Sequence, residues 1–419
     1  MSSNKKRFRC KKFIPSLQTN ASVVHWIHEK AKEWICLKRT FLRYGMVGGS
    51  LNAFIGGVHR RAVAMNENAD LVAGCFSTKP ELNRECGEHY RLAEDRIYSD
   101  YIEMAEAESK RDDKIDWVSI CLPNNMHYAV AKKFLECGIN VYCEKPLTFT
   151  VEEAEELLRL TKEKDLIFGV NYSHSGNAMV KEAKAIVDAG LIGDVINVNA
   201  EYLQEYLVDD IGAGDKEMLQ LSSWRKDPVI SGGTNCLGDI ATHIEHTIAY
   251  ITGLKLKRVC AVMDSYGQPL DLTANVLVEY ENGAHGVYSS SQVCIGHMNG
   301  LVVRIFGLKG ALEWVQETPN VLYYTPKGQP TQTRHRGMGY NYPAVSDISR
   351  LPFGHPEGLY EAFANMYKAY TGALLKKING ETPTEADLDF PRIEDGVNGI
   401  RFVHACLTSN EGGSVWTEL

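Results

Sequence analysis

Three side chains in the middle of the chain have the chemistry needed to handle an alcohol proton. Lys145 follows Glu144 at the predicted end of a buried strand, and Asp239 and His243 lie four residues apart in a predicted helix. Residues four apart project from one helix face, so Asp239 and His243 can meet a common substrate. An imidazole with a pKa of about 6.5 suits a proton acceptor, and a lysine can stabilise a developing alkoxide. We therefore expect Lys145, Asp239 and His243 to be catalytic.

Each of these residues also has a simpler explanation. A lone His243 fits a core histidine, and a lone Asp239 fits a charge on a helix surface. If both act in catalysis, the carboxylate can orient the imidazole or bind a second hydroxyl. His243 and His246, with Glu245 between them, also suggest a metal site, but no clear third ligand follows, so we expect no metal.

The elements that position these residues alternate between strand and helix from Leu42 onward. Near-continuously apolar strands are predicted at 42–47, 70–76, 117–122 and 139–143, with helices around 79–93, 100–112 and 126–138 between them. Such runs are typical of buried parallel strands. The order predicts an α/β domain with a doubly wound parallel sheet whose ligand binds at the carboxyl ends of the strands.

The pattern changes after the predicted helix at 151–163. Longer strands with alternating polarity indicate a large, mainly antiparallel open sheet, half-covered by helices at 176–189 and 236–252. We therefore expect a Rossmann domain at 41–165 and an α+β domain at 166–419. The strands are predicted at 194–203, 258–264, 274–280, 285–292, 301–306 and 321–324, and the closing helices at 357–376 and 392–408.

A glycine-containing turn follows the first strand. Gly48 and Gly49 lead through Ser50 and Asn52 to Ala53 and the next helix, an arrangement close to the dinucleotide fingerprint. Ser50 stands at the second glycine position and Ala53 at the third, where close helix packing is the requirement. An ordinary strand–helix turn is the alternative, but the position at the first such junction favours a pyrophosphate site.

The second and third strands end in further polar residues. The second runs into Ser77 and Lys79 without the acid that binds the adenosine ribose of NAD, so NAD and NADP both stay open. The third ends at Pro123 and Asn124, with His127 opening the next helix. These residues are candidates for cofactor contact. Helix capping is the alternative in both places: the segment that follows Ser77 could cap one helix, and Asn124 could cap the other.

Composition excludes several classes of protein. The 419 residues include 44% hydrophobic and 23% charged residues, and no apolar run approaches the roughly 20 residues needed to cross a bilayer. A net charge of −8 argues against general nucleic-acid binding. Eleven cysteines without a C-x-x-C pair favour reduced thiols and a cytoplasmic location. Residues 1–40 hold ten Lys/Arg against two acids, and we expect this basic extension to lie outside the core.

From Leu42 onward the chain closely resembles the Gfo/Idh/MocA oxidoreductases, named for glucose–fructose oxidoreductase and inositol dehydrogenase. The resemblance implies a Rossmann domain, a second domain whose open sheet commonly forms the oligomer interface, and an NAD(P)-dependent reaction on a sugar or polyol. The matching runs are Tyr44-Gly-Met-Val-Gly-Gly49, Leu122-Pro-Asn-Asn-Met-His127, Cys143-Glu-Lys-Pro146, Trp224-Arg225 and Leu237-Gly-Asp239-Ile-Ala-Thr-His243.

The resemblance also implies individual roles. Lys145 matches a lysine that contacts substrate oxygen and the nicotinamide ribose, and Asp239 and His243 match the catalytic pair. Trp224 and Arg225 match a segment that lines the cofactor. The chain departs from the family at Ser50, Asn235 and Ala241, where glycines are common. We expect the departure at Ser50 to affect the affinity for the cofactor, and those at Asn235 and Ala241 to change the shape of the pocket.

Together these features predict hydride transfer between NAD or NADP and a secondary hydroxyl of a sugar, inositol-like polyol or glycoside. Tyr172 and His174, near the expected domain junction, are candidate substrate contacts. We expect a homodimer or homotetramer that uses the second sheet. A redox-assisted glycosidase, which oxidises, eliminates and re-reduces, is the main alternative. A non-catalytic cofactor sensor is another, but the presence of Lys145 and His243 disfavours it.

Overall fold

The computed structural model describes residues 38–211 and 223–419, and Phe41–Leu419 form one compact unit. Most of the expected basic extension, residues 1–37, lies outside the described residues. None of the helices in the described part of the chain is long and apolar enough to cross a membrane.

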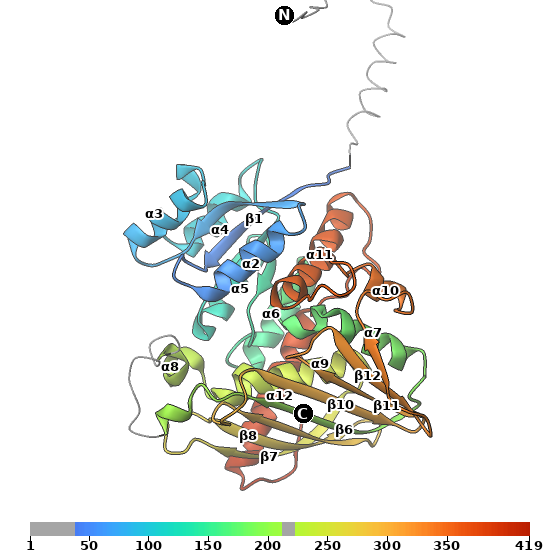
Figure 1. Cartoon of the computed structure of the whole chain (residues 1–419). Helices are drawn as coiled ribbons and strands as arrows, with labels where there is room; N and C mark the ends of the chain where they lie inside the picture. Colours follow the sequence, from blue (N-terminus) through green and yellow to red (C-terminus); the bar gives the residue numbers. More distant parts are fainter. Residues whose placement is uncertain (1–37, 212–222) are drawn as a thin grey trace, which may run out of the picture. The chain divides into compact units, whose positions relative to one another are not determined.

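The first domain, coloured blue to teal in Figure 1, is built on a five-stranded parallel sheet with the order β2-β1-β3-β4-β5. Its strands are strongly apolar, and every residue of β3 is buried, as expected where helices cover both faces. The strands are β1 (Leu42–Gly48), β2 (Ala69–Cys75), β3 (Trp117–Cys121), β4 (Asn140–Cys143) and β5 (Phe168–Val170). The helices are α2 (Phe54–Ala64), α3 (Pro80–His89), α4 (Tyr101–Ser109), α5 (His127–Glu136) and α6 (Val151–Glu163).

Local signals explain where α6 begins. Thr150 Oγ1 accepts a hydrogen bond from Glu153 N at 3.2 Å, and Glu153 Oε2 accepts one from Thr150 N at 3.3 Å. This reciprocal cap satisfies two backbone N–H groups at the helix start. The expected domain boundary after residue 165 falls between α6 and β5, a strand that belongs to the first sheet.

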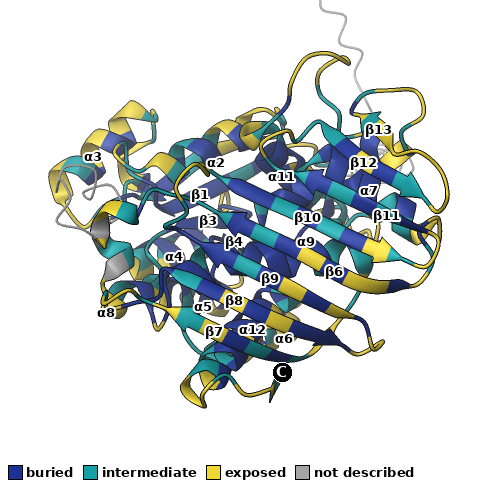
Figure 2. Ribbon diagram, turned by 60° about the horizontal axis from the view of Figure 1, so that its bottom comes forward, coloured by how far each residue is buried: buried dark blue, intermediate teal, exposed yellow. Residues whose placement is uncertain are grey.

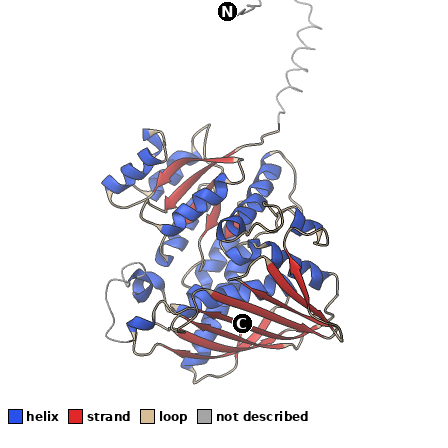
Figure 3. Ribbon diagram, viewed as in Figure 1, coloured by secondary structure: helices blue, strands red, loops and turns tan. Residues whose placement is uncertain are grey.

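The second sheet has nine strands in the order β13-β12-β11-β10-β6-β9-β8-β7-β14. All neighbours are antiparallel except β6 and β9. Helices α7 (Ala178–Asp188), α9 (Thr242–Thr252) and α12 (Ile393–Glu411) cover one face of the sheet (Figure 3), and along its strands exposed residues lie between buried ones (Figure 2). The strands are β6 (Val195–Leu203), β7 (Leu256–Asp264), β8 (Thr273–Tyr280), β9 (His285–Ser291), β10 (Gly300–Gly307), β11 (Gly310–Val315), β12 (Val321–Pro326), β13 (Gln332–His335) and β14 (Thr417–Glu418).

Helix α11 (Leu359–Ile378) returns from the second sheet to the first domain and packs against α2. Its aromatic side chains complete the core of that domain: Tyr367 stacks on Tyr142 at 4.3 Å between ring centroids, and Tyr370 meets Trp117 at 5.9 Å. The C-terminal part of the chain therefore supplies part of the first domain's core.

Short segments connect the two sheets near the predicted catalytic residues. Asp239 lies in a π-helical turn, η7 (Leu237–Ala241), which runs directly into α9, so the single helix expected at 236–252 has two geometries. The sequence patterns also did not predict strands β5, β11, β13 and β14. The remaining short elements are η1 (Glu94–Arg96), η2 (Asn124–Met126), η3 (Ser173–Gly176), η4 (Val208–Asp210), η6 (Ser223–Lys226), α8 (Pro228–Ser231) and α10 (Pro343–Ser346).

Candidate active site

Lys145 and Asp239 meet where the end of β4 faces η7. Lys145 Nζ donates to Asp239 Oδ1 at 2.8 Å and to the Asp239 backbone oxygen at 2.7 Å. Both side chains are largely buried, with 14% and 19% of their surface exposed. The structure thus brings together two residues that lie far apart in the sequence, one from each domain.

The second carboxylate oxygen of Asp239 is also occupied. Gln292 Nε2 donates to Asp239 Oδ2 at 3.0 Å, and Arg225 Nε lies 3.6 Å from the same oxygen. Burial by itself raises the pKa of Asp239, but Lys145 and Arg225 hold this pKa well below its ordinary value. Asp239 is therefore ionised at neutral pH.

Gln292 extends this network into the second sheet, and the sequence analysis did not identify it. Its Nε2 also lies 3.0 Å from Tyr206 Oη, and its Oε1 accepts from Asn235 Nδ2 at 2.8 Å. Gln292 directly follows the alternating strand β9 and is fully buried. An amide at the end of a strand that points into the interior is the signal that could have identified it.

The hydrogen-bond partner of His243 is another histidine. His243 Nδ1 lies 3.1 Å from His174 Nδ1, and His174 Nε2 lies 3.3 Å from Gln316 Oε1. The carboxylate of Asp239 binds Lys145 instead, so the orienting contact that Asp239 could have made is made by His174. Burial lowers the pKa of His174 to about 4, and burial also lowers the pKa of His243, with Lys145 adding to the effect. Both histidines are neutral at pH 7.

Glu144, next to Lys145, sits in a buried polar cluster. Its Oε1 lies 2.8 Å from His59 Nε2 and accepts from Asn171 Nδ2 at 2.5 Å, while His59 Nδ1 lies 2.7 Å from Tyr367 Oη. Burial by itself raises the pKa of Glu144, but His59 and Lys145 hold this pKa below its ordinary value. The cluster ties the end of β4 to α2 and α11, and neither His59 nor Asn171 was predicted from the sequence.

The turn after β1 has the form of a phosphate cradle. Gly48 and Gly49 have φ of 77° and 65°, and a Cβ on Gly48 would lie 2.3 Å from the Cys121 backbone oxygen. Ala53 precedes α2 and offers no side-chain cap, which leaves the first N–H groups of the helix for a ligand. The residues present therefore fit the pyrophosphate of a dinucleotide.

Close packing of α2 on this turn depends on Gly56. A Cβ on Gly56 would lie 2.3 Å from the Gly49 Cα. The close approach of α2 to the turn therefore leaves no room for a side chain at Gly56. Ala53 stands at the third fingerprint position, and Gly56 lies three residues further along the chain. Two consecutive glycines inside a helix, Gly56 and Gly57, are costly and were the available signal.

Other expected cofactor residues follow the ends of β2 and β3, where they contact neighbouring segments of the chain. Ser77 Oγ accepts from Lys79 N at 3.1 Å, and Lys79 side-chain atoms are exposed. Asn124 Nδ2 donates to the Ser231 backbone oxygen at 3.1 Å, which joins the end of β3, beyond Pro123, to α8. Asn124 thus bridges two segments and does not cap a helix.

His127 and Tyr172 are fully buried. The His127 ring nitrogens lie 2.7 Å from the Pro146 oxygen and 2.9 Å from the Leu122 oxygen, so this side chain joins the loops after β3 and β4. Tyr172 stacks on His246 at 4.6 Å and meets His243 edge-on at 5.8 Å. Both are candidates for ligand contact, and in this structure their side chains contact residues around the site.

The segment of Trp224 and Arg225 lies at the site itself. The Arg225 guanidinium sits 4.6 Å from the centroid of the Trp224 ring, and the charge of Asp239 raises the pKa of Arg225. Within residues 38–211 and 223–419, no three His, Cys, Asp or Glu side chains gather in a way that could hold a metal ion.

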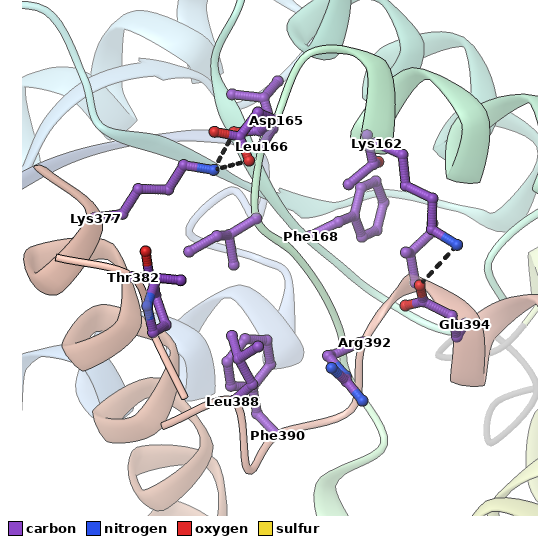
Figure 4. A pocket seen from close by; sticks show the side chains of 14 residues that line it. Lys162, Asp165, Leu166, Phe168, Lys377, Thr382, Leu388, Phe390, Arg392 and Glu394 are labelled. Atoms are coloured by element: carbon purple, nitrogen blue, oxygen red, sulfur yellow. Dashed lines mark hydrogen bonds and ion pairs between the residues drawn. The ribbon is translucent and has the colours of Figure 1, made fainter. Parts of the chain in front are cut away.

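A separate pocket of about 370 Å³ lies between the end of α6 and residues 382–394 (Figure 4). Lys377 pairs with Asp165 at 2.7 Å and Lys162 with Glu394 at 3.3 Å, so these charges on its rim are compensated. The pocket is not lined by Lys145, Asp239 or His243, and we assign it no part in the chemistry of the site.

Comparisons with known proteins match both domains. Residues 42–172 match a family described as an oxidoreductase family with an NAD-binding Rossmann fold, and residues 180–313 match the GFO/IDH/MocA C-terminal domain. An uncharacterized oxidoreductase, YfiI, from Bacillus subtilis is 37% identical over 382 residues, which cover 90% of this chain and 96% of YfiI. Levoglucosan dehydrogenase from Pseudarthrobacter phenanthrenivorans is 26% identical over 351 residues, or 76% and 83% of the two chains.

A solved structure agrees with these matches. An inositol dehydrogenase homolog from Azotobacter vinelandii, complexed with NAD+, has a TM-score of 0.84 and 34% identity, and the match covers 91% of this chain and 98% of that one. The agreement spans both domains and therefore also the junction at which Lys145 meets Asp239.

Proposed function

Because the chain belongs to the GFO/IDH/MocA family of NAD-binding oxidoreductases, we propose that it oxidises a secondary hydroxyl of a sugar or an inositol-like polyol. The observation that carries this proposal is the contact of Lys145 with Asp239, with His243 one helical turn further on. Family members named for their substrates include levoglucosan dehydrogenase and myo-inositol 2-dehydrogenase, both of which act on polyhydroxylated rings.

The residues divide the reaction between them. When bound, the nicotinamide supplies the acceptor for the hydride. Gly48, Gly49 and the first turn of α2 would hold the pyrophosphate. Lys145 stabilises the negative charge that develops on the substrate oxygen, and His243 accepts the hydroxyl proton. Each of these acts on the oxygen of the reacting alcohol, so both need to lie near it.

The polar network favours a substrate with several hydroxyls. Asp239 is an ionised acceptor: its Oδ1 binds Lys145, and its Oδ2 faces the donors Arg225 and Gln292. A sugar or polyol carries neighbouring hydroxyl groups that both donate and accept, which suits a site that contains charged donors and acceptors. These contacts favour a polyhydroxylated substrate.

A panel of sugars, inositols and glycosides, with NAD and NADP in turn, tests the proposal through formation of reduced nicotinamide. Lys145→Ala should lower kcat by about 10²–10³ because one electrostatic stabiliser is lost, while Lys184→Ala, on an exposed part of α7, should be neutral. Glycoside cleavage without net reduced nicotinamide would instead support the redox-assisted glycosidase. Near wild-type turnover in Lys145→Ala would contradict the assigned role.

We further propose that the protein forms a homo-oligomer through the open face of the second sheet. Leu277 and Val287 are direct cross-strand neighbours on β8 and β9 and remain 48% and 39% exposed. Val262 and Phe306 are exposed on other strands of the same sheet. A broad sheet face with exposed apolar side chains is typical of a surface that a partner covers.

A further inference from the structure

The two histidines beside Lys145 share one hydrogen bond. His174 Nδ1 and His243 Nδ1 lie 3.1 Å apart, and the ring planes meet at 82°. A hydrogen bond between two imidazole nitrogens needs a proton on one and a lone pair on the other. The tautomer of one histidine therefore dictates the tautomer of the other.

Gln316, the residue after β11, determines the direction of this bond. Its Oε1 lies 3.3 Å from His174 Nε2, and an amide oxygen can only accept, so His174 Nε2 carries the proton. Neutral His174 then has a lone pair on Nδ1, and His243 Nδ1 is the donor. In the described part of the chain, the hydrogen bond of His243 uses Nδ1 and leaves Nε2, with its lone pair, open.

The ring of His174 is held in place from two sides. Tyr202 packs against it at 5.8 Å with the planes at 88°, and Trp314 at 6.2 Å with the planes at 75°. Only 5% of His174 is exposed. The two aromatic rings and the two hydrogen bonds fix the orientation of the His174 ring, with Nδ1 directed at His243.

Resting on the proposed function, we propose that His174 is a positioning residue that holds His243 in the tautomer whose Nε2 accepts the substrate proton. The proton that leaves the hydroxyl ends on His243 Nε2, and no proton passes through His174. Once protonated, His243 still donates from Nδ1 to His174 Nδ1, and this charge-assisted bond stabilises the imidazolium. His174 thus takes the place of the carboxylate that often orients a catalytic histidine.

The surroundings keep His174 neutral, as this arrangement requires. Burial lowers the pKa of His174 to about 4, and His246 and Lys145 act in the same direction. An uncharged His174 retains the Nδ1 lone pair throughout the neutral range. The titratable or charged groups that face the pair are Lys145, His246, Tyr172 and Tyr202.

Two substitutions at His174 separate positioning from packing. Asn places an amide oxygen near the position of Nδ1 and so keeps an acceptor, whereas Leu has none. His174→Leu should lower kcat by about 10–100-fold with KM and cofactor affinity nearly unchanged, and His174→Asn should recover most of the rate. Equal losses in both variants, or a raised KM with unchanged kcat, would overturn the proposal, and the second result would make His174 a substrate contact.

Two substitutions at half-buried Gln316 test the direction of the bond without touching either histidine. Gln316→Glu can only accept, so it should retain activity, whereas Gln316→Met should lower kcat several-fold, to about a third or less. The added carboxylate also raises the pKa of His174, which it contacts, and of His243 beyond it, and both imidazoles must be neutral for His243 to accept the proton. The acid limb of kcat/KM should therefore move to higher pH in Gln316→Glu. An inactive Gln316→Glu would show that the amide donates and the bond runs the other way.

A measurement that needs no substrate separates this inference from the proposed function. In protein with ¹⁵N-labelled histidine, the ring nitrogen shifts report the tautomer, and His243→Asn and His174→Asn spectra assign the two signals. We expect the Nδ1–H form for His243 and the Nε2–H form for His174 near pH 7. The reverse pattern would overturn the inference even in an active enzyme, whereas the expected pattern in a protein inactive on every polyol would refute only the proposed function.

Discussion

At the scale of single residues, the two oxygens of Asp239 limit what this carboxylate can do. Oδ1 binds Lys145, while Oδ2 binds Gln292 and lies near Arg225. Its pKa is lowered, so it is unsuited to donate or hold a proton at neutral pH. Asp239 fixes the position of the lysine ammonium, and in the proposed reaction proton transfer is left to His243, a neutral imidazole in the same segment.

We also expect single residues, at the end of β2, to decide cofactor choice. No acid follows the strand there, and Ser77 and Lys79 occupy the positions near the expected adenosine ribose. An acid would accept from the ribose hydroxyls of NAD and repel the 2′-phosphate of NADP. We therefore expect NADP to be tolerated beside NAD.

Ser77→Asp should shift the ratio of the NADP and NAD dissociation constants towards NAD by about tenfold or more. Ser77→Ala removes the hydroxyl without adding charge and serves as the control. Titration calorimetry of both cofactors with the three proteins gives the ratio. If Ser77→Asp and Ser77→Ala give the same ratio, the ribose does not bind at this strand end.

At the scale of elements, helix α2 connects the cofactor turn to the catalytic strand end. Its Gly56 packs on Gly49 in the turn, and its His59 binds Glu144 beside Lys145. One helix thus positions both the expected pyrophosphate site and the neighbour of the catalytic lysine. Displacement of α2 should affect cofactor binding and turnover together.

The adjacent glycines of α2 offer a matched pair of substitutions. Gly56→Ala places a Cβ 2.3 Å from the Gly49 Cα, so the helix or the turn must shift, and both NAD affinity and melting temperature should fall. In Gly57→Ala the nearest atom is the flexible Arg61 Nη1 at 3.0 Å, and the gain in helix propensity of about 1 kcal/mol should make it neutral or stabilising. Thermal melts with and without NAD test both. Equal behaviour of the two variants would show that the close approach at Gly56 is unimportant.

The same elements show what the sequence can and cannot predict. The buried strands β1 to β4 and helix α6 were predicted nearly to the residue, because apolar periodicity and a capping box are local signals. The family and its NAD-binding Rossmann fold are confirmed. The proposed catalytic roles of Lys145, Asp239 and His243 stay predictions.

Contacts between distant segments could not be predicted. The bonds of His174 to Gln316 and of Asp239 to Gln292 join residues whose proximity depends on the order of strands in the second sheet. That order places β6 between β9 and β10, which periodicity within each strand does not specify. Likewise, nothing local to His59 indicates that it binds Glu144.

At the scale of the whole molecule, the second sheet has a covered face and an open one. Helices α7, α9 and α12 bury the first face, and α9 carries His243. The open face leaves the pair Leu277 and Val287 exposed. Association through this face would bury apolar surface without covering the side on which the catalytic residues lie.

Leu277→Lys should weaken or abolish the oligomer, because a buried charge at the interface carries a desolvation penalty and faces its own copy in a symmetric dimer. Ile378→Lys, at the end of α11 and similarly exposed, should leave the assembly unchanged. Light scattering coupled to size-exclusion chromatography gives the mass of each. A wild-type mass for Leu277→Lys, or a monomeric wild type, would contradict the proposed interface.

The path of α11 has a consequence for how the protein is made. The strands of the first sheet emerge from the ribosome early, whereas α11, the helix that covers Tyr142 and Trp117, is synthesised near the end of the chain. Until then the nascent domain exposes the aromatic surface that α11 covers. Strand β6 likewise cannot pair before β9 and β10, its neighbours on either side, have been synthesised. The first domain and α11 therefore mature together after synthesis is almost complete. A fragment cut after β5 would be prone to aggregation, so any minimal cofactor-binding version of this protein needs α11 fused back onto the first domain.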